Sequence, residues 1–353
     1  MTYAPGPYGY GYAPAPPPPK PGVIPLAPLD LNHVLSGAFG AYRRHWKTLF
    51  GMALASYALA AVVVVGLGIA AWATLGDQWE ASPASQDPSL SDLAPFLVVL
   101  GALWLVVALG MLLATGLLHA AAAVVVQEAV LGRRVGFGTV WRRAWSRLGS
   151  VLGTIVLSAL AALVPMLLFL VGLVLMLGAM IAGIAASEGN HVDDGTGLAL
   201  TGLLVLLLAL GTIPAVVWIW VKFSLAPTAA VIESAGPLTA MRRSAQLVRG
   251  DWWRIFGYTL VMVLIVGGIS FAVQMTLRLA THLTVFAEPL TRHATPGTVF
   301  AAATTAIAVT GLLQLLAQVL LGPLQPLASG LLYVDQRIRR ENLGPALAAQ
   351  TAA

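Results

Sequence analysis

The chain of 353 residues contains no cysteine and few charged residues. The absence of cysteine excludes disulfides, thiol catalysis and cysteine metal sites. Only 9% of the residues are Asp, Glu, Lys or Arg, whereas 58% are hydrophobic. The usual charged share is roughly 25%, and a soluble fold of this length could not remove so much apolar surface from water. The composition therefore indicates an integral membrane protein.

Motifs for known chemistry are also missing. The six histidines do not cluster and no His-Glu-x-x-His occurs, so the sequence offers no recognisable metal site. No Gly-Lys dipeptide occurs, which excludes a Walker A loop. We therefore expect a protein without a cofactor, without catalytic residues and without enzymatic activity.

Long apolar runs predict an all-α, polytopic membrane protein with six transmembrane helices. The runs cover about residues 49–75, 95–126, 151–186, 198–221, 252–279 and 299–321. With their flanking segments they form one transmembrane domain, residues 29–343. No cleavable signal peptide is evident, so the first helix is expected to act as an uncleaved anchor.

The two ends of the chain differ from the apolar middle. Residues 1–28 are rich in Pro, Gly and Tyr, which predicts a disordered cytoplasmic tail with polyproline character. This tail is read either as a solvated leader or as a docking strip for a partner. Residues 344–353 form a short C-terminal tail.

Three short basic segments have the pattern of amphipathic helices that lie in the membrane interface. In the third, Leu238, Met241 and Val248 share one face, while Arg242 and Arg249 occupy another. Each Lys or Arg near an anionic leaflet contributes on the order of 1 kcal/mol before screening. Because such arginines lie where the lipid phosphates are, phospholipid is the expected partner and nucleic acid is not. The predicted anionic-lipid interface consists of Arg43, Arg44, Lys47, Arg142, Arg143, Arg147, Arg242, Arg243, Arg249 and Arg254.

The distribution of charge predicts the orientation. Seventeen of the 19 basic residues fall on one side of the six helices, and eight of the 14 acids fall on the other. The positive-inside rule then places both termini in the cytoplasm. Arginine outnumbers lysine 16 to 3, a bias that suggests a GC-rich bacterial genome. We therefore expect a multi-pass protein of the bacterial inner membrane.

An internal repeat is predicted from the spacing of the arginine pairs. The first pair is followed by the second after 99 residues and by the third after a further 100. The pairs are Arg43-Arg44, Arg142-Arg143 and Arg242-Arg243. One unit would comprise a basic interfacial helix, an outgoing helix, an acidic loop and a returning helix; chance spacing is the alternative. Repeated membrane units often enclose a site between them, but they also arise simply as packing scaffolds.

Polar residues inside the apolar runs are few. Gln314 and Gln318 share a helix face, where they either bond neighbouring helices or line a polar path. Arg278 and His282 lie one turn apart at an outer helix end, where snorkelling or an anion contact would account for them. No acid or base is placed near the midplane, which argues against a proton-coupled or ion-coupled transporter.

Three short motifs carry a resemblance to a known family. They are residues 223–234 (FSLAPTAAVIES), 249–257 (RGDWWRIFG) and 333–343 (YVDQRIRRENL). Over roughly residues 25–343 the chain resembles bacterial six-helix membrane proteins of unassigned function. It is similar to the membrane domain that precedes the catalytic domain of some glycerophosphodiester phosphodiesterases. The phosphodiesterase activity does not follow, because that chemistry belongs to a separate barrel of about 250 residues that no stretch of this chain could form.

These observations favour a non-enzymatic membrane scaffold whose basic helices engage anionic lipid and a cytoplasmic or membrane protein partner. The alternative is a transporter or lipid-handling protein with a site between the repeats.

Overall fold

The computed structural model describes residues 21–81, 90–187, 195–287 and 296–343, with Pro345 and Ala349. Within these ranges every regular element is a helix, which confirms the predicted all-α fold. In chain order the helices are α1 (Leu31–Arg44), α2 (Trp46–Ala81), α3 (Leu90–Val130), α4 (Phe137–Ser187), α5 (Gly195–Phe223), α6 (Ala226–Ile232), α7 (Pro237–Val248), α8 (Trp252–Ala287), α9 (Pro296–Leu321) and α10 (Leu324–Glu341).

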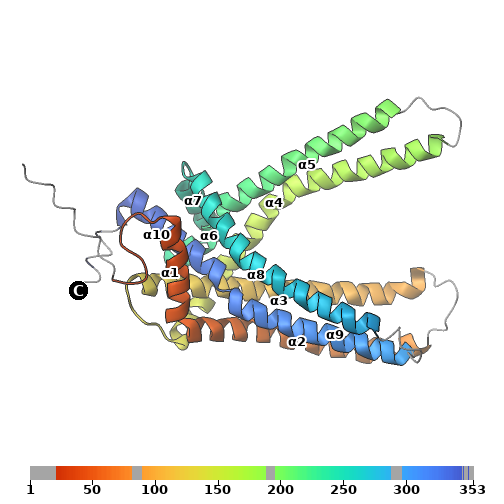
Figure 1. The fold of residues 1–353 in the computed structure, drawn as a ribbon, viewed down its shortest axis with the longest axis horizontal. Coiled ribbons are helices and arrows are strands. Elements are labelled where there is room, and N and C mark those ends of the chain that lie inside the picture. Colours follow the sequence, from red (N-terminus) through yellow and green to blue (C-terminus); the bar gives the residue numbers. More distant parts are fainter. Residues whose placement is uncertain are drawn as a thin grey trace, which may run out of the picture.

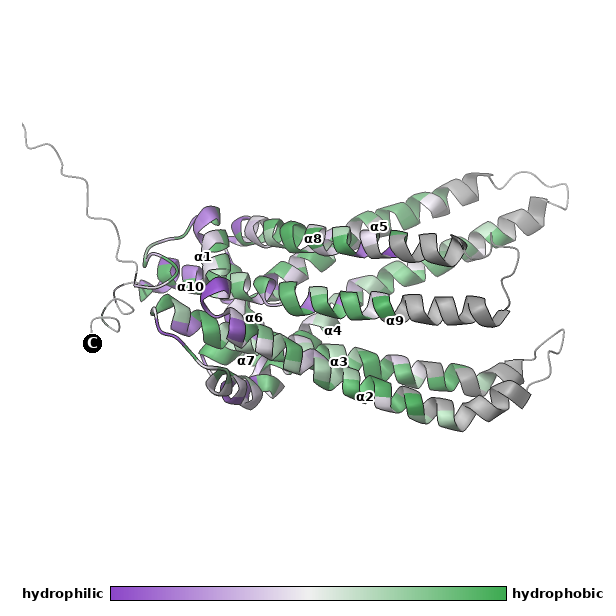
Figure 2. Cartoon of the chain, turned by 60° about the horizontal axis from the view of Figure 1, so that its bottom comes forward, coloured by the Kyte–Doolittle hydropathy of each residue, from purple (hydrophilic) through white to green (hydrophobic). Residues whose placement is uncertain are grey.

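Six stretches of the described chain are long and apolar enough to cross a membrane. They begin in α2, α3, α4, α5, α8 and α9, and each predicted transmembrane range lies inside one of these helices. Their outward surface is strongly apolar (Figure 2); Val62 is 70% exposed, Trp104 74% and Leu264 62%. Water would be a poor solvent for such a surface and lipid a good one. The protein is therefore a polytopic all-α membrane protein.

The long helices pair into three hairpins, α2/α3, α4/α5 and α8/α9. All three point the same way from a common base, where α1, α6, α7, α10 and residues 21–30 gather (Figure 1). We call these four helices and that segment the basal layer. The α4/α5 hairpin diverges from the other two hairpins with distance from the base (Figure 1). One close contact of α4 with α3 lies near the basal layer, where a Cβ added at Gly116 would be 2.6 Å from Leu152 Cδ2.

Helix α10 lies at the centre of the basal layer. Twelve of its 18 residues are buried, including Leu327, Leu331 and Tyr333, which are fully shielded from solvent. It packs on α3, where residues 120–126 are all at most 2% exposed. Small residues permit this contact, since a Cβ added at Gly330 would lie 2.9 Å from Val126 Cγ2. The core of the protein is thus concentrated at its basal end.

The second basic segment differs from its prediction. Residues 137–148 are the first turns of the continuous helix α4, and no break separates them from the predicted helix 151–186. The reason is an uninterrupted buried stripe, in which Val140 and Ala144 are followed at helical spacing by Leu148 and Val151. Because this stripe is continuous, the helix continues through Gly149 without a break. Of the three basic segments, only those of α1 and α7 are separate short helices.

The predicted boundary of the N-terminal tail also differs. Residues 21–28 belong to the packed core: Ile24 is fully buried and Leu26 is 8% exposed. The Val23 amide donates to the Ala129 carbonyl at the end of α3, at 3.2 Å. These few apolar side chains are sufficient because α1 and α3 provide a surface on which they pack. Residues 1–20 lie outside the described residues, as do Asp87, Asp194 and Glu288 of the predicted outer loops.

Candidate functional site

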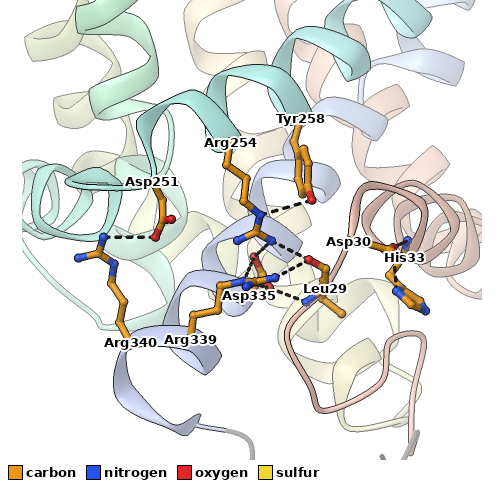
Figure 3. A network of polar contacts seen from close by, with 9 residues as sticks. All are labelled: Leu29, Asp30, His33, Asp251, Arg254, Tyr258, Asp335, Arg339 and Arg340. Carbon is orange, nitrogen blue, oxygen red and sulfur yellow. Dashed lines mark hydrogen bonds and ion pairs between the residues drawn. The ribbon is translucent and has the colours of Figure 1, made fainter.

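A buried carboxylate connects three separate parts of the chain in the basal layer (Figure 3). Asp335 on α10 is 0% exposed. Its carboxylate accepts from the Leu29 amide at 2.7 Å, from Arg254 Nη2 on α8 at 2.7 Å and from Arg339 Nε at 3.1 Å. Both arginines also donate to the Leu29 carbonyl, at 2.6 Å and 2.8 Å. We call this group the Asp335 cluster, and it fastens the N-terminal segment to α8 and α10.

A second charged group, the Glu233 cluster, joins the residues that follow α6 to α7 and α10. Glu233 accepts from Arg243 Nε at 2.8 Å and from the Tyr333 hydroxyl. Glu341 also pairs with Arg243 and accepts from Arg337 Nε at 2.8 Å. Burial by itself lowers the pKa of Arg243, but hydrogen bonds and charge attraction from Glu233 and Glu341 outweigh it and raise that pKa. The guanidinium therefore stays charged and holds three elements together.

An exposed tryptophan lies near the basal end of each hairpin. Trp46 at the start of α2 and Trp145 on α4 are each 51% exposed, and Trp253 at the start of α8 is 77% exposed. Amphipathic indole rings are typical of the membrane–water boundary. Trp46, Trp145 and Trp253 have the exposure expected of residues at such a boundary, which would then lie between the basal layer and the apolar part of the hairpins.

Just inside this boundary lies a cavity of ≈ 360 Å³. Its walls come from α3, α4, α5, α6, α8 and α10, so it lies where the α4/α5 hairpin meets the rest of the protein. Apolar side chains such as Ile219, Met262 and Leu332 form most of the lining, and no Asp, Glu, Lys or Arg takes part. The volume falls within the range of roughly 300–1,000 Å³ found for small-molecule sites.

His119 on α3 is the polar centre of this cavity. Its Nδ1 atom is buried and has no hydrogen-bond partner. A second cavity of ≈ 170 Å³ adjoins the first and shares Thr115, His119 and Gln325 with it. Gln318 also lines the second cavity. It is one of the two glutamines for which the sequence leaves open bonds between helices or a polar path.

The comparisons with known proteins give one match. A family model described as "Domain of unknown function (DUF7847)" matches residues 105–334. The chain belongs to this family. The matched range contains every residue that lines the larger cavity, together with Glu233, Arg243 and Arg254. No curated protein and no solved structure matches the chain.

The ten residues of the predicted lipid interface lie in three different environments. Arg143, Arg243 and Arg254 are in ion pairs, the first with Glu128 at 3.0 Å. Arg44 and Arg147 donate to backbone carbonyls, those of Gly132 and Ser234. The other five are exposed and make no ion pair within the described part of the chain; they are Arg43, Lys47, Arg142, Arg242 and Arg249. We call these five the exposed basic set.

Within the described ranges, no three His, Asp or Glu side chains lie close enough together to hold a metal ion. Asp335, Glu233 and Glu341 of the basal layer instead pair with arginines, and Asp30 pairs with His33. Sequence reasoning identified the arginines but not the acids that pair with them. A signal was present in α10, where Asp335 and Arg339, and likewise Arg337 and Glu341, are spaced i, i+4.

Proposed function

We propose that this protein is a non-enzymatic scaffold of the bacterial inner membrane whose basal layer lies at the cytoplasmic face and holds anionic lipid headgroups. The observation that carries the proposal is the position of the exposed basic set. Arg43 is on α1 and Arg242 is on α7, two helices of the basal layer (Figure 1), and Arg142 is in the first turns of α4, three residues before Trp145. This is the level at which phosphates of an anionic leaflet would lie, and the positive-inside rule favours the cytoplasmic leaflet.

The paired arginines have a different role in this proposal. Arg243 and Arg254 neutralise buried or half-buried acids, so their charge is used inside the protein. These ion pairs hold the helices of the basal layer together, so the basal layer forms a rigid plate. The exposed basic set lies on the surface of this plate. A rigid plate at a membrane surface suits a scaffold, because a protein partner then meets a preformed surface.

The threefold repeat is part of the proposal, and two ion pairs support it. Arg143 pairs with Glu128 in the last turn of α3, and Arg243 pairs with Glu233 ten residues after α5 ends. In two successive units, the second arginine of the pair thus binds an acid near the basal end of the preceding returning helix. The basic segments of α1 and α7 also precede the α2/α3 and α8/α9 hairpins, and the second basic segment forms the first turns of the α4/α5 hairpin. The similarity to the membrane domain of glycerophosphodiester phosphodiesterases stays a prediction.

The lipid part of the proposal is tested by charge removal. In the variant Arg43→Gln/Arg142→Gln/Arg242→Gln, we expect the ratio of anionic to zwitterionic phospholipid that co-purifies in mild detergent to fall at least tenfold. Each lost charge removes on the order of 1 kcal/mol of attraction before screening, and raised salt should weaken retention by the parent protein. Mass spectrometry of the co-purified lipid measures the ratio.

The matched control is Arg43→Lys/Arg142→Lys/Arg242→Lys, which keeps the charge and should retain most of the anionic lipid. An unchanged ratio in the glutamine variant would show that these arginines do not hold anionic lipid. Purification of the parent protein from native membranes in the same detergent tests the scaffold part of the proposal. We expect a stable protein complex to co-elute. Specific exchange of a lipid or solute across liposomes would instead favour the transporter or lipid-handling alternative, to which the cavity around His119 lends support.

A further inference from the structure

The depth of the larger cavity limits what can enter it. Thr259 and Met262 lie six and nine residues beyond Trp253 on α8, which is about 9–14 Å further along the helix. On α4, Ile155 lies ten residues beyond Trp145, or about 15 Å. Half of the hydrocarbon layer is about 15 Å thick. The α4 and α8 walls are therefore at the level of the hydrocarbon of the leaflet next to the basal layer, whereas α6 and α10 close the cavity on its basal side. Lipid can thus reach the cavity from the bilayer.

The lining excludes a charged ligand. None of its residues is Asp, Glu, Lys or Arg, so a phosphate or carboxylate drawn to this depth would find no opposite charge. Transfer of an unpaired ion into hydrocarbon costs several kcal/mol or more. The ligand that fits is uncharged.

The hydroxyl groups of the lining indicate which polar group the uncharged ligand carries. Ser158 and Thr259 each donate to a backbone carbonyl at 2.7 Å, Ser224 does so at 2.8 Å and Ser329 at 2.9 Å. Each proton is thus already used, and each oxygen still has lone pairs that can accept. His119 adds a ring nitrogen with no partner. The Gln325 amide also lies in the lining and can both donate and accept. Such polar groups beside apolar surface match a ligand that has a hydroxyl group, which both donates and accepts, at one end and a hydrocarbon chain at the other.

We propose that the cavity around His119 binds an uncharged lipid with a free hydroxyl group, of the diacylglycerol class. The hydroxyl donates to the acceptors near His119, and acyl chain fills the apolar space toward Ile219 and Met262. Entry is from the bilayer, between α5 and α8, where the hairpins begin to diverge (Figure 1). This proposal does not depend on the exposed basic set, which acts at the membrane surface.

Photo-crosslinking tests the proposal on the full chain in lipid nanodiscs. The probes are diacylglycerol with a diazirine in one acyl chain, its methyl ether without the hydroxyl, and phosphatidic acid with the same chains. We expect the diacylglycerol probe to label peptides of α3 and α8 that line the cavity about tenfold more than either of the others. A lost hydrogen bond of about 1.4 kcal/mol corresponds to that factor.

Two variants and a control locate the site. Ala162→Trp fills the cavity and should abolish the labelling, whereas Leu160→Trp, on a side chain that is 52% exposed and outside the lining, should leave it unchanged. His119→Leu removes the polar centre and should reduce labelling severalfold while the protein remains folded. The comparison of the three probes on the parent protein needs no variant. Equal labelling by the three probes, or labelling that survives Ala162→Trp, would overturn the proposal.

Discussion

Replacement of Asp335 by alanine is expected to lower the free energy of unfolding by about 3–5 kcal/mol, because it leaves two part-buried arginines and a buried backbone amide without their partner. The carboxylate is fully buried and accepts from Arg254, Arg339 and the Leu29 amide. In the variant, two guanidinium groups would face each other around an empty space. The Leu29 amide, itself buried, would also lose its acceptor. Equilibrium unfolding in mixed detergent micelles measures the loss.

Asp251 provides the matched control. It pairs with Arg340 at 3.3 Å, and both side chains are about one-third exposed. Solvent screens such a pair, which contributes less than about 1 kcal/mol. The buried Gln336 amide would also lose its hydrogen bond to Asp251, which adds about 1 kcal/mol to the cost of Asp251→Ala. If Asp335→Ala were no more damaging than Asp251→Ala, the Asp335 cluster could not be what fastens the N-terminal segment to the basal layer.

Tyr333→Ala is expected to be comparably destabilising, by about 3–5 kcal/mol, the range of large aromatic-to-alanine changes in packed cores. Tyr333 is fully buried at the centre of α10, and its hydroxyl donates to Glu233. Truncation would leave a cavity in the middle of the basal layer. It would also remove one of the bonds between α10 and the residues that follow α6. The same unfolding experiment measures the effect.

Tyr333→Phe separates packing from hydrogen bonding. This variant keeps the ring and removes only the hydroxyl, so we expect a loss of about 1.5–3 kcal/mol, the usual contribution of a hydrogen bond to a charged group. Glu233 would still be paired with Arg243, which argues for the lower end of that range. Equal losses in the alanine and phenylalanine variants would show that the ring contributes nothing to packing, contrary to its complete burial.

The arrangement of the long helices could be predicted because the bilayer imposes it. A span of hydrocarbon requires about 20 apolar residues, and each predicted run lies inside a helix of the structure. The extent of α4 could not be predicted in the same way. Residues 137–148 carry arginines on one face and apolar residues on the other, as an interfacial helix does, yet Val140 and Val151 belong to one buried stripe. Whether such a segment bends onto the interface or continues straight depends on what packs against it.

Helix α10 shows why the candidate site was only partly predictable. Its arginines have the pattern of a basic interfacial helix, but twelve of its residues are buried. The helix can pack in the core because Glu341, Asp335 and Asp251 pair with its arginines. The i, i+4 pairs are visible in the sequence, whereas Glu233 and Arg254 come from other elements and are brought together only by the fold. The cavity around His119 gives no sequence signal, since its lining is drawn from positions between 115 and 332.

The absence of native cysteine permits a direct test of the central claim, which is a six-helix protein with its basic end in the cytoplasm. Single cysteines are introduced at Asp87, Asp194 and Glu288 on one side and at Arg43 and Arg242 on the other. A membrane-impermeant maleimide is then applied to spheroplasts with an intact inner membrane. We expect labelling at the first three positions, and labelling at the two arginine positions only after the membrane is permeabilised. Protection at any of the first three, or labelling of Arg43→Cys or Arg242→Cys before permeabilisation, would contradict the account.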